Sequence, residues 1–411
     1  MQRSADATKQ RNDMAKTYRR IHASSHPRSP GLLTEGCCRM AIYNEDHTDP
    51  VAVVPDTVGM LEKQWSLSDP YPAVNNQPEQ SRHTMSVAAI LEEAQITTDL
   101  AAIESLLWER MQSRSDLLTA AGVHTVLAGG KRLRAALTVL AARSCRYNQH
   151  YPHHEVMHAA AAVELIHAAS LVHDDLVDRA AYRRGRVTVH VRWDDEVALM
   201  LGDYLFALGA AEMSRLSDRR IIAFYAEAVQ TIVAGELSPV TCVAPFAVAR
   251  QQYLYKTRCK TAALFAAACK AGMAAGGGRD ADIEAAGGYG QAVGMAFQIA
   301  DDVLDFVGTE AVLGKPAGND LRQGTITLPL IYAVANGGSA ALTTIVQDPA
   351  PSDTALNAAV AEVIDRGGVE RARADAQQYI RQAVAHLSHF PASRARQALI
   401  DLAAFVVERQ Q

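Results

Sequence analysis

The spacing of apolar residues changes at Met85. From there onward apolar residues recur every three or four positions, and only short segments containing Gly, Pro or Asp interrupt them. This period is typical of helices that bury one face, and no segment alternates with period two over a length that would form a sheet. The sequence predicts helices over 85–112, 116–128, 131–147, 153–180, 193–216, 218–238, 248–276, 280–306, 325–335, 355–366, 368–388 and 392–409.

Residues 1–84 differ from the rest of the chain. They hold seven of the fifteen prolines, ten basic and ten acidic residues, and no sustained hydrophobic period. Such a segment is typical of disorder. Seven Lys or Arg against two Asp in residues 1–34 give a weak likeness to an organellar transit peptide. We predict instead a disordered or mis-started extension over 1–84, followed by one all-helical domain over 85–411.

Composition narrows the classes of function. The 411 residues are 49% hydrophobic and only 6% aromatic, which favours close packing of helices in an all-α fold. A formal net charge of −5 provides no general basic surface for nucleic acid. Six cysteines without CxxC spacing indicate reduced thiols in a cytoplasmic protein. No apolar run reaches the roughly 18 to 20 residues of a membrane span, so no transmembrane segment is expected.

Two aspartate clusters end apolar helices with the same spacing. In each, the carboxylates stand at positions i, i+1 and i+4, which share one side of a helix. Carboxylates at the mouth of a buried helix require a compensating cation, and an oxygen-only set suits Mg²⁺ with phosphate oxygens and water completing its shell. The first cluster is Asp174, Asp175 and Asp178, and the second cluster is Asp301, Asp302 and Asp305.

Basic residues lie in settings that suit phosphate binding. The segment Gly129 to Arg134, of sequence GGKRLR, opens a predicted helix, where free N–H groups and three cations could hold a diphosphate. Arg183 and Arg184 follow the first cluster, and Lys260, Thr261 and Lys315 flank the second. Each of these basic segments is by itself a weak indication of phosphate binding. Together they provide the two cationic sets that two diphosphates would need.

The combination resembles a known family. DDxxD twice, GGKRxR, RRG, KTA and GKPxGxDLRQG together are similar to the trans-isoprenyl diphosphate synthases (polyprenyl synthetases) of the long-chain type, over about residues 85–411. The resemblance implies a single helical bundle of the isoprenoid synthase type with a central hydrophobic cavity. It also implies a homodimer that condenses an allylic diphosphate with isopentenyl diphosphate and delivers its product to a membrane.

The resemblance assigns roles residue by residue. It implies that the six aspartates of both clusters bind Mg²⁺, three ions for each active site with substrate bound. Arg183, Lys260, Gln298 and Lys315 would contact the allylic diphosphate, with Thr261 beside them and Lys260 counted with the aspartates as catalytic. Lys131, Arg134, His167 and Arg184 match the positions for the diphosphate of isopentenyl diphosphate. Ala135 and Thr325 depart from the common Pro and Lys, and neither position is a metal ligand.

Small residues precede the first cluster. Ala169 and Ser170 lie one turn before Asp174, with Ile166 a further turn back, along the direction in which the product should grow. In the family a Phe or Tyr at the first two positions stops elongation. We therefore expect a product of about six or more isoprene units, with a tunnel floor around Tyr204 to Leu208. Farnesyl or geranylgeranyl diphosphate synthesis is the alternative.

Three other classes of protein deserve comparison. Glu155-x-x-His158 and Glu164-x-x-His167 have the ExxH spacing of di-iron centres, but both fall on one helix, nine residues apart and on opposite faces. A terpene cyclase would resemble this chain only in its first cluster. A non-catalytic subunit of a heteromeric synthase would be expected to lose the acids, although a catalytic chain could still need a partner.

Overall fold

The computed structural model describes residues 86–127, 129–145, 152–308 and 318–408, all within one compact unit, Glu79–Gln411. The predicted extension over 1–84 and the candidate ligand Lys315 lie outside the described residues. Helices dominate the described part, as predicted.

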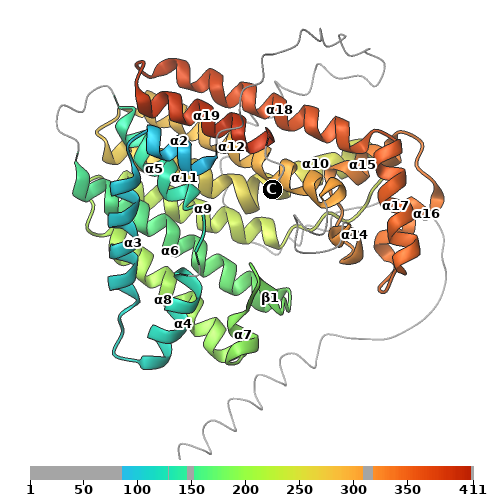
Figure 1. Cartoon of the computed structure of the whole chain (residues 1–411), viewed down its shortest axis with the longest axis horizontal. Coiled ribbons are helices and arrows are strands. Elements are labelled where there is room, and N and C mark those ends of the chain that lie inside the picture. The colour runs from blue at the N-terminus through green and yellow to red at the C-terminus, as the bar shows by residue number, and fades with distance from the viewer. Residues whose placement is uncertain (1–85, 128, 146–151, 309–317, 409–411) are drawn as a thin grey trace, which may run out of the picture. The chain divides into compact units, whose positions relative to one another are not determined.

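The elements follow one another with short connections (Figure 1). They are α2 (Val87–Glu93), α3 (Thr97–Met111), α4 (Asp116–Val126), α5 (Leu133–Arg143), α6 (His153–Val177), β1 (Tyr182–Arg183), β2 (Arg186–Val187), α7 (Val189–Arg192), α8 (Asp195–Met213), α9 (Arg220–Glu236), α10 (Phe246–Thr257), the π-helix η3 (Arg258–Ala262), α11 (Ala263–Ala275), α12 (Asp280–Val307), α14 (Asn319–Arg322), α15 (Leu328–Ala335), α16 (Ala340–Thr344), the 3₁₀ turn η4 (Ile345–Gln347), α17 (Asp353–Asp365), α18 (Gly368–His386), the 3₁₀ turn η5 (Leu387–His389) and α19 (Arg394–Glu408).

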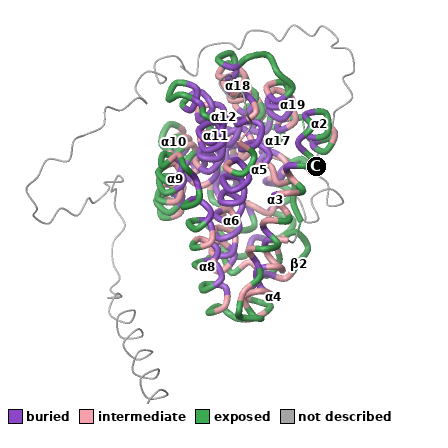
Figure 2. The backbone as a smooth tube through the Cα atoms, turned by 90° about the vertical axis from the view of Figure 1, so that its left-hand side faces the viewer, coloured by how far each residue is buried: buried purple, intermediate pink, exposed green. Residues whose placement is uncertain are grey.

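Helices α6, α11 and α12 form the centre of the core. α6 packs against α5, α8 and α11, and α12 packs against α11 and α18. Figure 2 shows the central helices largely buried. Small residues allow this closeness, because a Cβ added to Gly272 of α11 would stand 2.0 Å from the carbonyl oxygen of Thr138. The low aromatic content therefore indicated close helix packing correctly.

α6 corrects one expectation from the sequence. By length and composition this helix is apolar enough to cross a membrane, although we had expected no such run. In its most apolar window 78% of the residues are buried inside the protein, against the neighbouring helices. α6 is therefore the core helix of the bundle, and its hydrophobicity reflects burial on every side.

The structure differs from the predicted elements at several boundaries. The predicted helix 85–112 is interrupted after α2, where Gln95 adopts a left-handed conformation with φ 58°. The predicted helix 131–147 begins only at Leu133, because Arg132 before it is also left-handed, with φ 44°. Within the predicted helix 248–276, residues 258–262 form a π-helix. Among the described cysteines, Cys242, Cys259 and Cys269 are free thiols, as expected.

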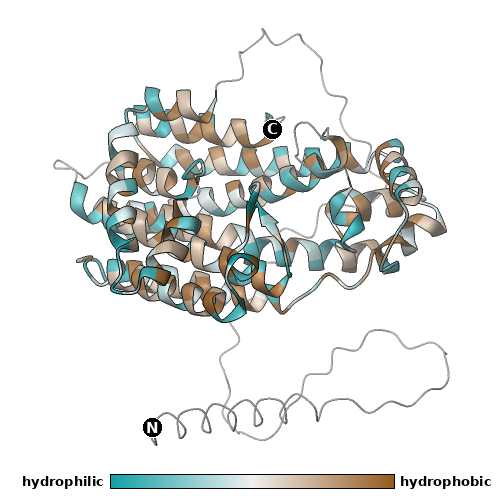
Figure 3. Ribbon diagram, turned by 60° about the horizontal axis from the view of Figure 1, so that its bottom comes forward, coloured by the Kyte–Doolittle hydropathy of each residue, from teal (hydrophilic) through white to brown (hydrophobic). Residues whose placement is uncertain are grey.

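A short antiparallel hairpin was also missed. β1 pairs with β2 through Tyr182 to Val187 and Arg183 to Arg186, and its mostly hydrophilic strands are the arrows in Figure 3. Its two-residue loop, Arg184 and Gly185, has φ of 51° and 73°. Positive φ at both loop positions is the geometry of a type I′ turn. Strands of two residues are too short for a period-two pattern to reveal.

Candidate active site

The first cluster faces two cations. Asp174 and Asp175 lie in the last turn of α6, and Asp178 is its C-cap residue. The Nε of Arg183 donates to Oδ1 of Asp175 at 2.7 Å, and the Lys260 Nζ lies 3.5 Å from Oδ2 of Asp174. Burial raises the pKa of Asp174 and of Asp175 although these cations oppose it. The carboxylates at the end of α6 are thus crowded and only partly neutralised.

The hairpin joins the first cluster to the Gly-Gly loop. Its tight turn directs Arg183 to Asp175, while Nη1 of Arg184 donates to the carbonyl oxygen of Gly129 at 2.9 Å. A Cβ on Gly130, whose φ is 148°, would stand 2.9 Å from the same nitrogen. Glycine at this position therefore lets the arginine approach the backbone. Two motifs that are 55 positions apart in sequence meet here.

In the second cluster, Asp302 has neutral hydrogen-bond partners. Asp302 is 5% exposed, and it accepts hydrogen bonds from the Tyr253 hydroxyl at 2.5 Å and from Nε2 of Gln298 at 2.9 Å. Burial, followed by the nearby negative charge of Asp320, raises the pKa of Asp302 to about 8. The backbone N–H of Asp320 donates to Oδ2 of Asp305 at 2.9 Å. The third member of the cluster, Asp301, is exposed.

The π-helix η3 connects the two clusters. Lys260 reaches Asp174 of α6 and also lies 2.6 Å from Oε1 of Glu236. The next residue, Thr261, donates to Oε1 of Gln298 on α12 at 2.8 Å, and Gln298 in turn donates to Asp302. Adjacent residues of η3 therefore contact the ends of two different helices. π-helical turns are frequent at functional sites, and this one brings both clusters to a common region.

A second cationic group lies beside the Gly-Gly loop. Arg134 and Arg184 both lower the pKa of His167, after burial, which lowers it most. Burial lowers the pKa of Arg134 to about 10, and its guanidinium lies over the Phe265 ring, 4.6 Å from the centroid. The structure thus brings together three of the four residues predicted to bind the second diphosphate. We call Arg134, His167 and Arg184 the isopentenyl set.

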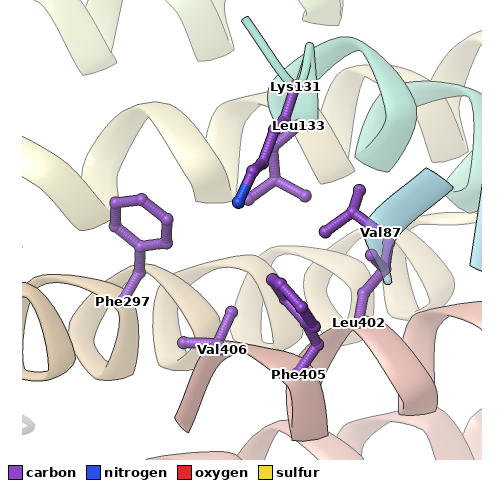
Figure 4. Close-up of a pocket in the computed structure, with 7 residues that line it drawn as sticks. All are labelled: Val87, Lys131, Leu133, Phe297, Leu402, Phe405 and Val406. Atoms are coloured by element: carbon purple, nitrogen blue, oxygen red, sulfur yellow. The ribbon is translucent and has the colours of Figure 1, made fainter. Parts of the chain in front are cut away.

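The fourth predicted residue, Lys131, has a different neighbour. Its side chain is exposed, and its Nζ lies over the ring of Phe405 on α19, 5.3 Å from the centroid. Figure 4 shows Lys131 directed into an apolar recess that Phe405 and Phe297 both line. Lys131 therefore lies against the C-terminal helix of the bundle.

One of the three cations in the GGKRLR segment is structural. Arg132 donates to Oε1 of Glu104 at 2.6 Å and to the carbonyl oxygen of Val126 at 2.6 Å, and its Nη1 lies 3.4 Å from Oε2 of Glu164. The expectation that all three cations hold a diphosphate is therefore wrong for Arg132. Its partners are carboxylates inside the protein, which tie the loop to α3 and α6.

The ExxH motifs also have structural partners. Glu164 accepts a hydrogen bond from the backbone N–H of Ala135 at 3.0 Å, in the first turn of α5. Glu155 accepts from the backbone N–H of Ser217 at 3.0 Å, and His158 is hydrogen bonded through Nδ1 to Glu212. These contacts account for both glutamates without a di-iron centre.

The donor set fits a hard cation that brings other ligands with it. Among the described residues, no three His, Cys, Asp or Glu side chains are grouped closely enough to hold a metal ion by themselves. Both clusters nevertheless offer carboxylate oxygens and no interleaved His or Cys, which favours Mg²⁺ over transition metals. Mg²⁺ is commonly held by one or two carboxylates with substrate phosphates and water supplying the rest.

The predicted chain-length residues lie along α6. Ala169 is fully buried, Ser170 is half-buried, and the Ser170 hydroxyl donates to the carbonyl oxygen of His167 at 2.9 Å. Ile166 is buried against α8, where a Cβ on Gly209 would stand 3.1 Å from its Cγ1. Their effect on product length stays a prediction.

Sequence reasoning missed several residues of the site. Tyr253 and Asp320 contact or influence the second cluster, and Glu236 binds Lys260. Tyr253 is one of three aromatic residues in α10, so no local pattern distinguishes it. Glu236 is the last residue of α9, and only the fold shows its contact with Lys260. Asp320 stands within the DLRQG segment, which was noted as a motif without a role for this acid.

Known proteins resemble the chain over most of its length. Residues 115–363 match the family model described as polyprenyl synthetase. "Heptaprenyl diphosphate synthase component 2" of Geobacillus stearothermophilus is 39% identical over 76% of this chain and 97% of its own. "Octaprenyl diphosphate synthase" of Haemophilus influenzae is 31% identical over 76% and 94%. The crystal structure of polyprenyl synthase from Caulobacter crescentus complexed with calcium and isoprenyl diphosphate, 35% identical, aligns with TM-score 0.74 over 80% of this chain and 100% of its own.

Proposed function

Since this chain belongs to the polyprenyl synthetase family, we propose that it extends an allylic diphosphate with successive isopentenyl diphosphates to give a long all-trans polyprenyl diphosphate. One observation carries the proposal. Lys260 and Thr261, adjacent in η3, contact the first cluster and the hydrogen-bond network of the second. A diphosphate that bound at this junction would lie within reach of both carboxylate clusters.

Magnesium fits the acidic half of the site. The six aspartates of the two clusters would hold it, with three ions for each active site when substrate is bound. The metal would polarise the allylic diphosphate and stabilise the charge that develops on the departing pyrophosphate. A solved relative contains calcium with isoprenyl diphosphate, and calcium also prefers oxygen ligands.

The protein's own cations complete the binding of the allylic diphosphate. Arg183 and Lys260 neutralise carboxylates in the ligand-free protein, and both can turn to an incoming diphosphate. Gln298 and Thr261 would orient it, and Lys315 would add a further cation. These groups favour departure of pyrophosphate because its negative charge grows as the allylic bond breaks.

The isopentenyl set and Lys131 would hold the second diphosphate. The lowered pKa of His167 makes this residue a neutral hydrogen-bonding group, while Arg134 and Arg184 supply charge. The double bond of isopentenyl diphosphate then attacks the allylic carbocation, and loss of a proton restores an alkene. The apolar interior along α6 excludes water that would quench the cation. The departing pyrophosphate serves as the base for that proton.

Product length follows from the residues before the first cluster. Ala169 and Ser170 leave room for a growing chain where a larger side chain would block it. Relatives with longer and shorter products both occur, including "Solanesyl diphosphate synthase 2" of Arabidopsis thaliana and "Short chain isoprenyl diphosphate synthase" of Methanothermobacter thermautotrophicus. Small side chains at 169 and 170 support the long-chain assignment.

Assembly is a further part of the proposal. α8 and α9 expose the apolar side chains Leu199, Met200, Ile222 and Val233, and Leu237 follows α9. We expect a second copy of this chain to cover them, because the chain carries both acidic clusters and the isopentenyl set and so needs no partner for chemistry. Two relatives are nevertheless named component 2 of heptaprenyl diphosphate synthase. A cytoplasmic dimer that releases its product to a membrane is the resulting proposal.

Product analysis tests the function directly. The purified full chain is incubated with Mg²⁺, farnesyl diphosphate and labelled isopentenyl diphosphate, and the dephosphorylated products are sized. A ladder that ends at one product of about six or more isoprene units supports the proposal. Accumulation of farnesyl or geranylgeranyl diphosphate contradicts it. Elongation that begins only when a second protein is added contradicts the homodimer.

A Ser170→Phe variant tests the direction of chain growth. Because Ser170 is half-buried one turn before the first cluster, the ring should block the growing chain. The product should shorten by several isoprene units while consumption of farnesyl diphosphate continues, as chromatography of the products would measure. Ser214→Phe, at the exposed C-cap of α8, is the control and should leave the product unchanged. An unaltered product in the first variant would show that growth follows another path.

A further inference from the structure

The first and the last of the three cations in the GGKRLR segment lie over aromatic rings. Arg134 lies over Phe265 at 4.6 Å, and Lys131 lies over Phe405 at 5.3 Å. Phe297 connects the two places, because its ring packs on Phe265 with a centroid distance of 5.5 Å and it lines the same recess as Phe405. Both cations are therefore supported by one group of aromatic side chains, drawn from α11, α12 and α19.

The recess around Lys131 is apolar. Figure 4 shows its lining, which comes from the start of α2 and from α5, α12 and α19: Val87, Leu133, Phe297, Leu402, Phe405 and Val406. The four-carbon stem of a lysine packs well against such a surface, and the ammonium is attracted to the face of an aromatic ring. The neighbours of the Lys131 side chain in this recess are apolar, and the face of the Phe405 ring lies next to its ammonium.

Restraint matters because a free lysine is flexible. Its long side chain has many rotamers, and fixing one of them on ligand binding costs conformational entropy. A ring that already holds the ammonium reduces this cost. Phe297 links this place to the isopentenyl set, because it lines the recess that holds Lys131 and packs on Phe265, the ring beneath Arg134.

We propose that Phe405 of α19 is a positioning residue for isopentenyl diphosphate, acting through Lys131. The inference rests on the proposed function, in which Lys131 binds that diphosphate. Phe405 touches neither diphosphate. Its ring holds the Lys131 ammonium beside Phe297, so that Lys131 loses little conformational entropy when it binds the substrate. The C-terminal helix thereby contributes to selection of the second substrate.

Two substitutions at the same position separate this role from packing. Phe405→Leu keeps an apolar side chain and removes the aromatic face, whereas Phe405→Tyr keeps both. We expect the Leu variant to raise the KM for isopentenyl diphosphate about 3- to 10-fold, with little change in the KM for the allylic substrate. The Tyr variant should match the unaltered protein. Val406→Ala, which trims the same recess without facing a cation, is the control for packing.

A double substitution tests whether Phe405 acts through Lys131. If it does, Phe405→Leu should add almost nothing to the defect of Lys131→Ala, because the interacting cation is already absent. Equal KM values for isopentenyl diphosphate in the Leu and Tyr variants would overturn the proposal. So would independent, multiplicative effects in the double variant, or an equal rise in KM in Val406→Ala.

Binding without turnover keeps the test separate from the proposed function. Calorimetric titration of the full chain and of Phe405→Leu with isopentenyl diphosphate alone measures affinity even if no elongation occurs. A 3- to 10-fold weaker Kd in the Leu variant would support the positioning role whatever the product assay shows. Unchanged affinity in a protein that does elongate would overturn the positioning role and leave the proposed function intact.

Discussion

The two aspartate clusters have the same sequence spacing and different surroundings. At the end of α6 the carboxylates face two cations, Lys260 and Arg183. At the end of α12, Asp302 accepts hydrogen bonds from the neutral groups of Tyr253 and Gln298. Asp174 and Asp175 of the first segment therefore pair with cations, whereas Asp302 of the second accepts hydrogen bonds from neutral groups.

This difference indicates which half of the site should rearrange when a diphosphate binds. A cation that neutralises a carboxylate can turn to an incoming diphosphate, because both partners are anions. A tyrosine hydroxyl and an amide have no net charge to exchange, so they hold Asp302 in one orientation with or without substrate. Asp174 and Asp175 are thus expected to change their partners on binding, and Asp302 to keep its partners.

The largest expected effect comes from removing a carboxylate from either cluster. Asp175→Asn and Asp302→Asn should each lower kcat by on the order of 10³-fold or more, because each removes a negative oxygen from the side that would hold Mg²⁺. Steady-state rates at saturating Mg²⁺ measure this. Similar losses in both variants would show that the clusters are equally necessary despite their different surroundings.

Asp195→Asn is the control for these variants. Asp195 lies in the first turn of α8, where it pairs with exposed Arg179 at 2.6 Å, so its loss should change activity little. Near-normal activity in Asp302→Asn would contradict a role of the second cluster in Mg²⁺ binding. Asp302 would then be a structural residue.

A smaller effect is expected from removing a cation beside the first cluster. Lys260→Ala should lower kcat/KM for the allylic substrate by about 10²-fold, because a charge-assisted contact with the departing pyrophosphate is lost. Arg258→Ala, two residues earlier in the same π-helix, removes an exposed cation and is the control. If both variants behaved alike, the general positive charge of this segment would matter more than the contact at Lys260.

The sequence predicts one cluster's surroundings better than the other's. Arg183 lies 8 positions from Asp175, inside a recognisable RRG segment, so its role could be proposed from a short stretch of sequence. Tyr253 lies 49 positions from Asp302 on another helix, where a single tyrosine resembles any core aromatic. Only the packing of α10 against α12 brings them together.

Short stretches of sequence also predict the interiors of helices. They do not predict where the helices end. A period of three or four residues persists along α6 or α12, so these helices are evident from the pattern. The left-handed residue Gln95 interrupts a predicted helix without glycine or proline to mark it. Arg132 is held by Glu104 and Glu164, which lie 28 and 32 positions away, so only the fold could show that this cation is structural.

The smallest expected effect concerns the neutral partners of the second cluster. Tyr253→Phe removes the hydroxyl that donates to Oδ2 of Asp302 and leaves the ring in place. A buried carboxylate that loses one donor is held less firmly, so we expect about 5- to 10-fold more Mg²⁺ for half-maximal activity and a modest fall in kcat. Titration of the rate with Mg²⁺ measures both.

Tyr289→Phe is the matched control for this prediction. Tyr289 is also buried on α12, but its hydroxyl donates to the carbonyl oxygen of Leu399 on α19 at 2.7 Å and not to a member of the cluster. Both variants lose one buried hydrogen bond, so each should cost about 1 kcal/mol of stability in denaturant unfolding. Only Tyr253→Phe should change the Mg²⁺ requirement. An equal Mg²⁺ response in the two variants would mean that Tyr253 supports α12 as packing alone, and that the second cluster depends on its carboxylates without a fixed neutral partner.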